Sequence, residues 1–151
     1  MMNLKQFFSG QWDITRTITD SDKRLYATVQ GTANFFHHTQ NALILEEKGQ
    51  VSLVNTGRNL DFTRQYIYVF DQQGMSIYFH DDITANNGLY QAYDWDDKSK
   101  QLQPRDKYLC SLDVYDAQFH LENAKTFWQN TDVVGPHKDY HVKTIFTRKN
   151  A

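Results

Sequence analysis

Apolar and polar residues alternate with a period of two over most of this 151-residue chain. In the run from Trp12 to Thr19, for example, Trp12, Ile14 and Ile18 alternate with polar residues. Successive side chains of a β-strand point to opposite sides, so this alternation is typical of strands that bury one face. No helical pattern after the first residues is long enough to connect parallel strands. The sequence therefore predicts an all-β fold of roughly nine or ten antiparallel strands, closed into a barrel or packed as a sandwich.

Two local features refine this prediction. Leu4, Phe7 and Phe8 share one face at helical spacing, which indicates a short helical turn or plug within residues 1–8. Small residues such as Gly31 interrupt a run of strand-forming residues, and we expect them where a curved sheet crowds its strands.

Clusters of turn-forming residues divide the chain into strands. Residues 42–48 and 50–54 are expected to be separate strands, and the charged segment 96–106 a connection. Residues 81–88 form the longest candidate loop of the first two thirds of the chain, a kind of loop that often borders a binding cavity. Because no linker or repeat interrupts the pattern, residues 1–151 are expected to form a single domain.

Composition and charge exclude several classes of protein. Aromatic residues make up 15% of the chain, which is too many for a disordered protein. The 16 basic and 18 acidic residues give a net charge of -2, so no global field favours nucleic acid or an anionic membrane. The single cysteine excludes an intrachain disulfide, and the first residues lack the apolar run of a secretory signal or of a membrane span. We therefore expect a cytoplasmic protein.

Gly10 and Trp12 open the first predicted strand, and Arg148 ends the last one. This arrangement resembles that of the calycin, or lipocalin-like, barrels. Gly permits a tight entry into the strand, Trp fills one end of the barrel, and a guanidinium group can lie over the indole while it donates to nearby carbonyls. The resemblance implies that Gly10, Trp12 and Arg148 close one end of a barrel.

A series of further motifs follows in a fixed order over most of the chain. They are Gly10-Gln11-Trp12 with Arg16, Gly31-Thr32-Ala33, Glu47-Lys48-Gly49, Arg64-Gln65-Tyr66, Phe79, Cys110 with Asp113 and Tyr115, and Gly135-Pro136-His137-Lys138-Asp139-Tyr140 before Arg148. In these motifs the chain resembles a small uncharacterised calycin-like family, catalogued as a domain of unknown function. The resemblance implies a single lipocalin-like barrel with polar residues inside, and it implies no activity.

Strand parity predicts which polar side chains enter the barrel. Inward-facing Trp12 places Arg16 inside, Leu43 and Leu45 place Glu47 inside, and Phe62 and Phe70 do the same for Arg64, Tyr66 and Tyr68. An unpaired buried charge costs several kcal/mol, so these groups must pair with one another or bind a ligand. In one interpretation Glu47 neutralises an arginine and the network is structural. In the other, a cavity binds an anionic ligand through Arg16 or Arg64.

The second interpretation predicts a protein that binds a small, partly apolar, anionic molecule in its interior. The candidate ligand-binding residues are Arg16, Glu47, Arg64, Tyr66, Tyr68, Lys138 and Tyr140, of which the last two are expected at the mouth of the last strand. No Gly-x-Ser-x-Gly or Walker-type motif is present, and the six histidines show no ligand spacing, so we expect no cofactor and no metal.

Two alternatives remain open at this stage. A calycin barrel with interior Arg, Glu and Tyr side chains also resembles the cofactor-free phenolic acid decarboxylases. This resemblance implies a lyase or isomerase in which Glu47 with a raised pKa would assist proton transfer. In the second alternative, side chains fill the interior of the barrel and the protein is an interaction protein. A cavity below about 100 Å³ would favour the filled barrel. An open cavity in which Glu47 touches no arginine would favour an acid–base role, whereas a tight pair between Glu47 and an arginine would favour a structural network.

Overall fold

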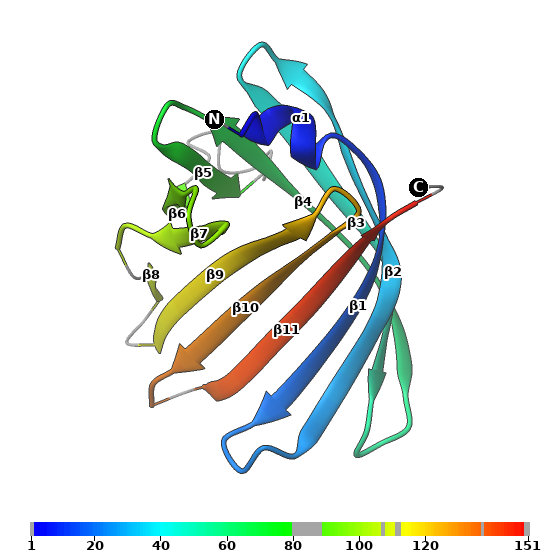
Figure 1. Cartoon of the computed structure of the whole chain (residues 1–151). Helices are drawn as coiled ribbons and strands as arrows, with labels where there is room; N and C mark the ends of the chain where they lie inside the picture. Colours follow the sequence, from blue (N-terminus) through cyan, green and yellow to red (C-terminus); the bar gives the residue numbers. More distant parts are fainter. Residues whose placement is uncertain (1, 80–88, 107, 111–112, 137, 150–151) are drawn as a thin grey trace.

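The computed structural model describes residues 2–79, 89–106, 108–110, 113–136 and 138–149, and it has one short helix and eleven strands in this part of the chain (Figure 1). The elements are α1 (Leu4–Phe8), β1 (Gly10–Asp20), β2 (Leu25–Thr39), β3 (Ala42–Leu53), β4 (Asn59–Phe70), β5 (Gly74–Phe79), β6 (Leu89–Asp96), β7 (Gln101–Pro104), β8 (Tyr108–Cys110), β9 (Asp113–Asn123), β10 (Thr126–Val134) and β11 (Asp139–Arg148). The loop expected at residues 81–88 lies outside the described residues.

The strands form one antiparallel sheet that closes on itself. Its order is β10-β11-β1-β2-β3-β4-β5-β6-β7-β9-β8, and β10 also pairs with β9. Ten of the described strands therefore form a closed ring, and β8 pairs with β9 outside it. This result confirms the predicted all-β antiparallel barrel with a short helical turn at its N-terminal end.

The helix α1 lies over one end of the barrel (Figure 1). An aromatic core packs beneath it at this closed end. Asn3 caps the helix by accepting from the backbone N–H of Gln6, and the helix presents Leu4, Phe7 and Phe8 to the interior. Phe8 packs edge-on against Phe127 at a centroid distance of 4.9 Å. Burial follows the predicted alternation, as the fully buried Trp12 and Ile14 of β1 illustrate.

One predicted pair of strands is a single strand. Residues 42–48 and 50–54, expected as two strands, join in β3, and Gly49 lies within it rather than in a turn. Gly49 pairs with Gly31 of β2. A Cβ atom on Gly31 would overlap the carbonyl oxygen of Lys48 and lie 2.9 Å from Cα of Gly49. The expectation that Gly31 lies where strands crowd is thus correct, and the same crowding explains Gly49.

The charged segment 96–106 also differs from its prediction as a connection. It contains the four-residue strand β7, which pairs with β6 and β9 and buries Leu102 completely. Pro104 ends this strand, where a missing N–H costs little. A strand with one buried apolar residue has too little alternation to be recognised from sequence.

We expect Gly31→Ala to lower the free energy of unfolding by about 1–3 kcal/mol, as overpacking of a crowded site does. The added methyl group would force β2 and β3 apart at the Gly31–Gly49 pair. Urea denaturation would measure the change, with Thr32→Ala at the exposed neighbouring position as control. Equal stability of the two variants would contradict the close approach.

Candidate functional site

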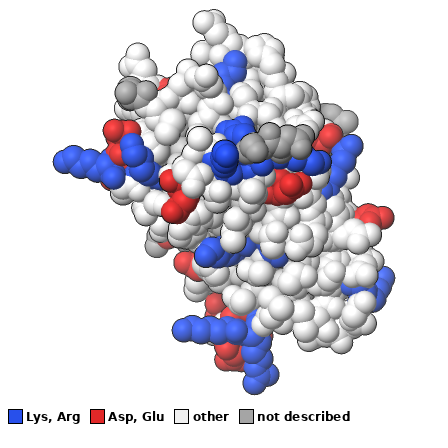
Figure 2. Space-filling model, turned by 45° about the vertical axis from the view of Figure 1, so that its right-hand side comes forward, with Lys and Arg blue, Asp and Glu red and all other residues white. Residues whose placement is uncertain are grey.

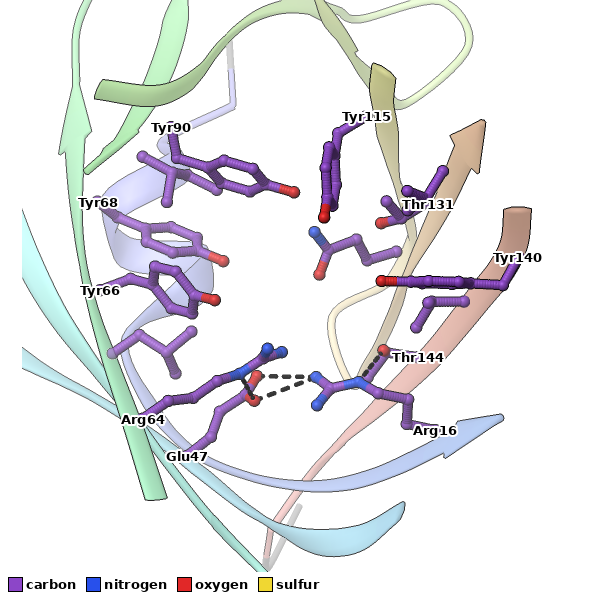
Figure 3. Close-up of a pocket in the computed structure, with 15 residues that line it drawn as sticks. Arg16, Glu47, Arg64, Tyr66, Tyr68, Tyr90, Tyr115, Thr131, Tyr140 and Thr144 are labelled. Atoms are coloured by element: carbon purple, nitrogen blue, oxygen red, sulfur yellow. Dashed lines mark hydrogen bonds and ion pairs between the residues drawn. The ribbon is translucent and has the colours of Figure 1, made fainter. Parts of the chain in front are cut away.

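A cavity of about 150 Å³ lies inside the barrel, and polar side chains from several strands line it (Figure 3). The labelled lining residues are Arg16, Glu47, Arg64, Tyr66, Tyr68, Tyr90, Tyr115, Thr131, Tyr140 and Thr144. The tyrosine side chains enter from opposite walls with their hydroxyl groups toward the centre, and the two arginines lie at one side of the space (Figure 3). We call this space the inner cavity.

Arg16, Glu47 and Arg64 form an ion-pair cluster at the edge of the inner cavity. Nη2 of Arg16 donates to Oε1 and Oε2 of Glu47 at 3.1 and 3.0 Å, and Nε of Arg64 donates to Oε1 at 2.8 Å. Nε of Arg16 donates to the hydroxyl oxygen of Thr144 at 2.7 Å. Glu47 and Arg64 are direct cross-strand neighbours on β3 and β4, whereas Arg16 reaches Glu47 from β1, across the intervening strand β2.

Burial differs within this cluster. The side chains of Arg16 and Glu47 are 6% and 2% exposed, whereas that of Arg64 is 44% exposed. Arg64 therefore lies where the interior meets solvent, with its Nε atom on Glu47. Its guanidinium carbon also lies 5.3 Å from the centre of the Tyr66 ring.

Electrostatics hold this cluster in its charged form. Burial disfavours the ionised form of Glu47, but the charges of Arg16 and Arg64 outweigh burial and lower the pKa of its carboxyl group. Burial likewise disfavours the charged form of Arg64, and Glu47 outweighs it and raises the pKa of Arg64. The pKa of Glu47 therefore moves in the direction opposite to the one that proton transfer requires. Two guanidinium groups and one carboxylate leave one positive charge.

Several hydrogen-bond donors of the inner cavity have no acceptor in the described part of the chain. They are Nη1 of Arg16 and both terminal nitrogens of Arg64. The hydroxyl groups of Tyr66 and Tyr68 likewise have no hydrogen-bond partner among the described residues. Burial raises the pKa of Tyr68 well above its usual range, so its hydroxyl group stays protonated and can donate.

Lys138 and Tyr140 lie farther out. Nζ of the exposed Lys138 donates to the hydroxyl oxygen of Tyr115 at 2.7 Å, and Lys138 does not line the inner cavity. Tyr140 does line it, and burial together with a hydrogen bond to Tyr115 raises the pKa of Tyr140. The structure therefore brings Arg16, Glu47, Arg64, Tyr66, Tyr68 and Tyr140 to one space and places Lys138 at its entrance.

Sequence reasoning missed part of the inner cavity. Tyr90, Gln129 and Thr131 line it but are absent from the predicted site. Gln129 and Thr131 share the parity of the buried Phe127 on β10, so the parity rule would have found them. Tyr90 lies at the register shift between β5 and β6, and such a shift removes the parity signal.

A second, larger cavity of about 780 Å³ adjoins the first at the open end of the barrel. Arg16, Arg64, Tyr140 and Val142 line both spaces. We call this second space the outer cavity. Arg16 and Arg64 therefore lie between the interior and the mouth of the barrel, and Arg64 is the exposed member of the cluster.

Gly10, Trp12 and Arg148 meet at the opposite end. The guanidinium carbon of Arg148 lies 4.1 Å from the centre of the Trp12 ring. Arg148 also donates to the backbone carbonyls of Phe7, Ser9 and Ala124 at 2.6, 2.9 and 3.0 Å. Gly10 has a φ of 110°, a left-handed conformation that favours glycine. These contacts tie α1, β1 and β11 together.

The outer surface carries charges of both signs. Lys, Arg, Asp and Glu side chains are interspersed on the face shown in Figure 2. No group of three or more His, Cys, Asp or Glu side chains that could hold a metal ion occurs in the described ranges. The single helix among the described residues is too short to cross a membrane.

Solved structures with similar folds cover nearly the whole chain. The S-type phycobiliprotein lyase CPES from Guillardia theta has a TM-score of 0.66 at 7% identity, with 98% of this chain and 92% of that chain covered. A redesigned β-barrel, mFAP1, bound to DFHBI, has a TM-score of 0.51 at 14% identity, with 97% and 100% covered. A protein of unknown function from the DUF3598 family of Nostoc punctiforme PCC 73102 has a TM-score of 0.54 at 9% identity, with 95% and 47% covered. At these identities the likeness shows the fold alone.

No curated protein matches the sequence. The expected membership of an uncharacterised family is confirmed, because a family model covers most of the chain. Its match extends over residues 8–148, and the protein belongs to the family of unknown function DUF6314.

Proposed function

We propose that this protein binds a small, partly apolar organic anion in the interior of its barrel. The observation that carries the proposal is the pairing of one carboxylate, Glu47, with two guanidinium groups, those of Arg16 and Arg64. This pairing leaves one positive charge. It also leaves three terminal guanidinium nitrogens whose N–H groups donate to no described residue. A ligand carboxylate would neutralise the charge and accept these N–H groups, which are charge-assisted and therefore strong donors.

The surrounding side chains support this role. Tyr66 and Tyr68 would donate their unpartnered hydroxyl groups to ligand oxygens, and Tyr140 and Lys138 lie toward the mouth. A barrel of similar fold, mFAP1, was solved with the small molecule DFHBI bound. We further propose that residues 1–151 form a single calycin-like domain, closed beneath α1 by Gly10, Trp12 and Arg148.

The geometry favours binding over the two alternatives. A cofactor-free lyase or isomerase needs a carboxyl group that exchanges protons near neutral pH. Glu47 is held ionised by two guanidinium groups, and both of its oxygens accept hydrogen bonds. A filled barrel would leave no room for a ligand, whereas the inner cavity of about 150 Å³ adjoins an outer cavity of about 780 Å³.

We expect Arg64→Met to weaken the binding of a small aromatic or aliphatic carboxylate roughly tenfold, at the lower end of what a hydrogen bond to a charged group contributes. The lower end applies because 44% of the Arg64 side chain is exposed and solvent screens its charge. Isothermal titration calorimetry would measure the affinity, and a thermal melt would verify that the barrel stays folded. Arg58→Met, which removes the same charge from an exposed turn, is the control.

The two variants separate a local contact from a general charge effect. Loss of affinity in Arg64→Met alone supports the site, because the overall charge of the two variants is equal. Unchanged affinity in Arg64→Met, or an equal loss in Arg58→Met, would refute it.

A further inference from the structure

We infer that the ligand is an amphipathic monocarboxylate that enters head first, with its carboxylate on Arg16 and Arg64 and its apolar body in the outer cavity. This inference rests on the proposed function and adds the chemical class and the orientation of the ligand. It follows from the position of the two arginines, the lining of the outer cavity, and the charges at the mouth of the barrel.

The two arginines lie at the boundary between the two cavities, since Arg16 and Arg64 line both. Beyond them, the inner cavity is small and rich in hydroxyl groups, at about 150 Å³. A ligand carboxylate and its nearest polar substituents fit this volume and this chemistry. The rest of a larger ligand must therefore lie on the outer side of the arginines.

The wall of the outer cavity is mainly apolar. Ile18, Val29, Val51, Phe62 and Val142 line it from five different strands. The strands β1–β4 are 11 to 15 residues long, whereas β5–β7 have 4 to 8 residues, so the long strands extend past the short ones at the end opposite α1 (Figure 1). Their inward faces form an apolar wall that an aliphatic or aromatic ligand body would cover.

The charges at the mouth select against a second negative group. Two carboxylates, Asp20 and Asp139, and one ammonium group, Lys138, line the outer cavity. The Lys138 ammonium donates to Tyr115. Oδ1 of Asp20 accepts from the backbone N–H groups of Asp22 and Arg24, which fixes this carboxylate in its position at the end of β1. A dicarboxylate of the same length would bring its outer charge toward these two aspartates, and the cluster inside has one positive charge to neutralise.

Calorimetric titration of the full chain with butanoate, hexanoate and octanoate tests this inference, with octanedioate and 1-octanol as matched ligands. We expect affinity to rise roughly threefold to fourfold with each added methylene, because each one covers apolar surface of the outer cavity. We expect octanedioate to bind about tenfold more weakly than octanoate, owing to repulsion by the aspartates. 1-Octanol should bind far more weakly than octanoate, because it carries no charge.

A double variant, Val51→Thr with Phe62→Thr, locates the ligand body. We expect it to flatten the dependence on chain length while butanoate binds as before, whereas Ile145→Thr on the outer face should leave the series unchanged. Equal affinity for all chain lengths, or octanedioate binding as tightly as octanoate, would overturn this inference and leave the anion site intact. If none of the acids binds, the proposed function itself fails. Should the double variant not fold, the wild-type series still decides.

Discussion

Glu47→Gln should lower the free energy of unfolding by about 3 kcal/mol, the lower end of the cost of removing one partner from a buried ion pair. The variant keeps the side-chain volume but leaves the 6%-exposed Arg16 without a counter-charge. Arg64 is less affected because it is partly exposed, which is why the lower end applies. Urea denaturation at neutral pH would measure the loss. Glu46→Gln on the neighbouring position of β3, where Lys48 and Gln65 contact a more exposed carboxylate, should cost less than about 1 kcal/mol.

The stability difference between wild type and Glu47→Gln depends on pH, and the direction of the pKa shift of Glu47 sets its sign. The pKa of Glu47 is lower in the folded protein than its ordinary value of 4.5, so the ionised form stabilises the fold above that pH. This contribution is lost as the pH falls below 4.5 through the lowered pKa of the folded state. The stability difference between wild type and Glu47→Gln should therefore shrink in acid. A difference that stays constant well below pH 4.5 would contradict the ionised cluster.

Trp12→Ala should lower the free energy of unfolding by about 3–5 kcal/mol, as truncation of large core residues does. The Trp12 side chain is fully buried, packs edge-on against Phe127 at 4.7 Å, and carries the guanidinium group of Arg148 on its face. Its Nε1 atom also donates to the backbone carbonyl of Phe8 at 2.9 Å. The substitution thus removes packing, a cation–π contact and the hydrogen bond that ties β1 to α1.

Trp128→Ala is the matched control for this prediction. Trp128 lies on the outer side of β10, where Lys143 covers its ring at 4.6 Å, and its loss should cost about 1 kcal/mol. Urea denaturation of both variants measures the difference. Equal losses of unfolding free energy in the two variants would contradict the role of Trp12 in closing the end of the barrel, because Trp12 would then stabilise the protein no more than a tryptophan on its outer face.

Much of the interior could be predicted from sequence because strand parity is a local rule. Buried Trp12 and Ile14 fix the side of β1 on which Arg16 lies, and buried Leu45 does the same for Glu47 on β3. Strand parity also predicted Arg64 in the interior, whereas its side chain lies at the edge of the interior and is partly exposed.

Strand parity cannot predict contacts between strands that are not neighbours in the sheet. Arg16 on β1 reaches Glu47 on β3 because the sheet curves and closes, and this curvature is a property of the whole barrel. The same holds for the sign of the pKa shift of Glu47, which depends on both arginines being within hydrogen-bond distance. The prediction of a break between two strands at Gly49 was wrong for a different reason. Glycine is typical both of turns and of close approaches between strands, and only the pairing with Gly31 decides between the two.

Side-chain NMR of the arginines tests the central claim most directly. Octanoate would be titrated into ¹⁵N-labelled protein, and the Nε–Hε signals of Arg16 and Arg64 would be assigned with Arg16→Lys and Arg64→Met. We expect these two signals to shift together along one binding curve, while the signals of Arg58 and Arg105 stay in place. Shifts confined to arginines outside the barrel, or saturation with both interior signals unmoved, would contradict a ligand site at these two guanidinium groups.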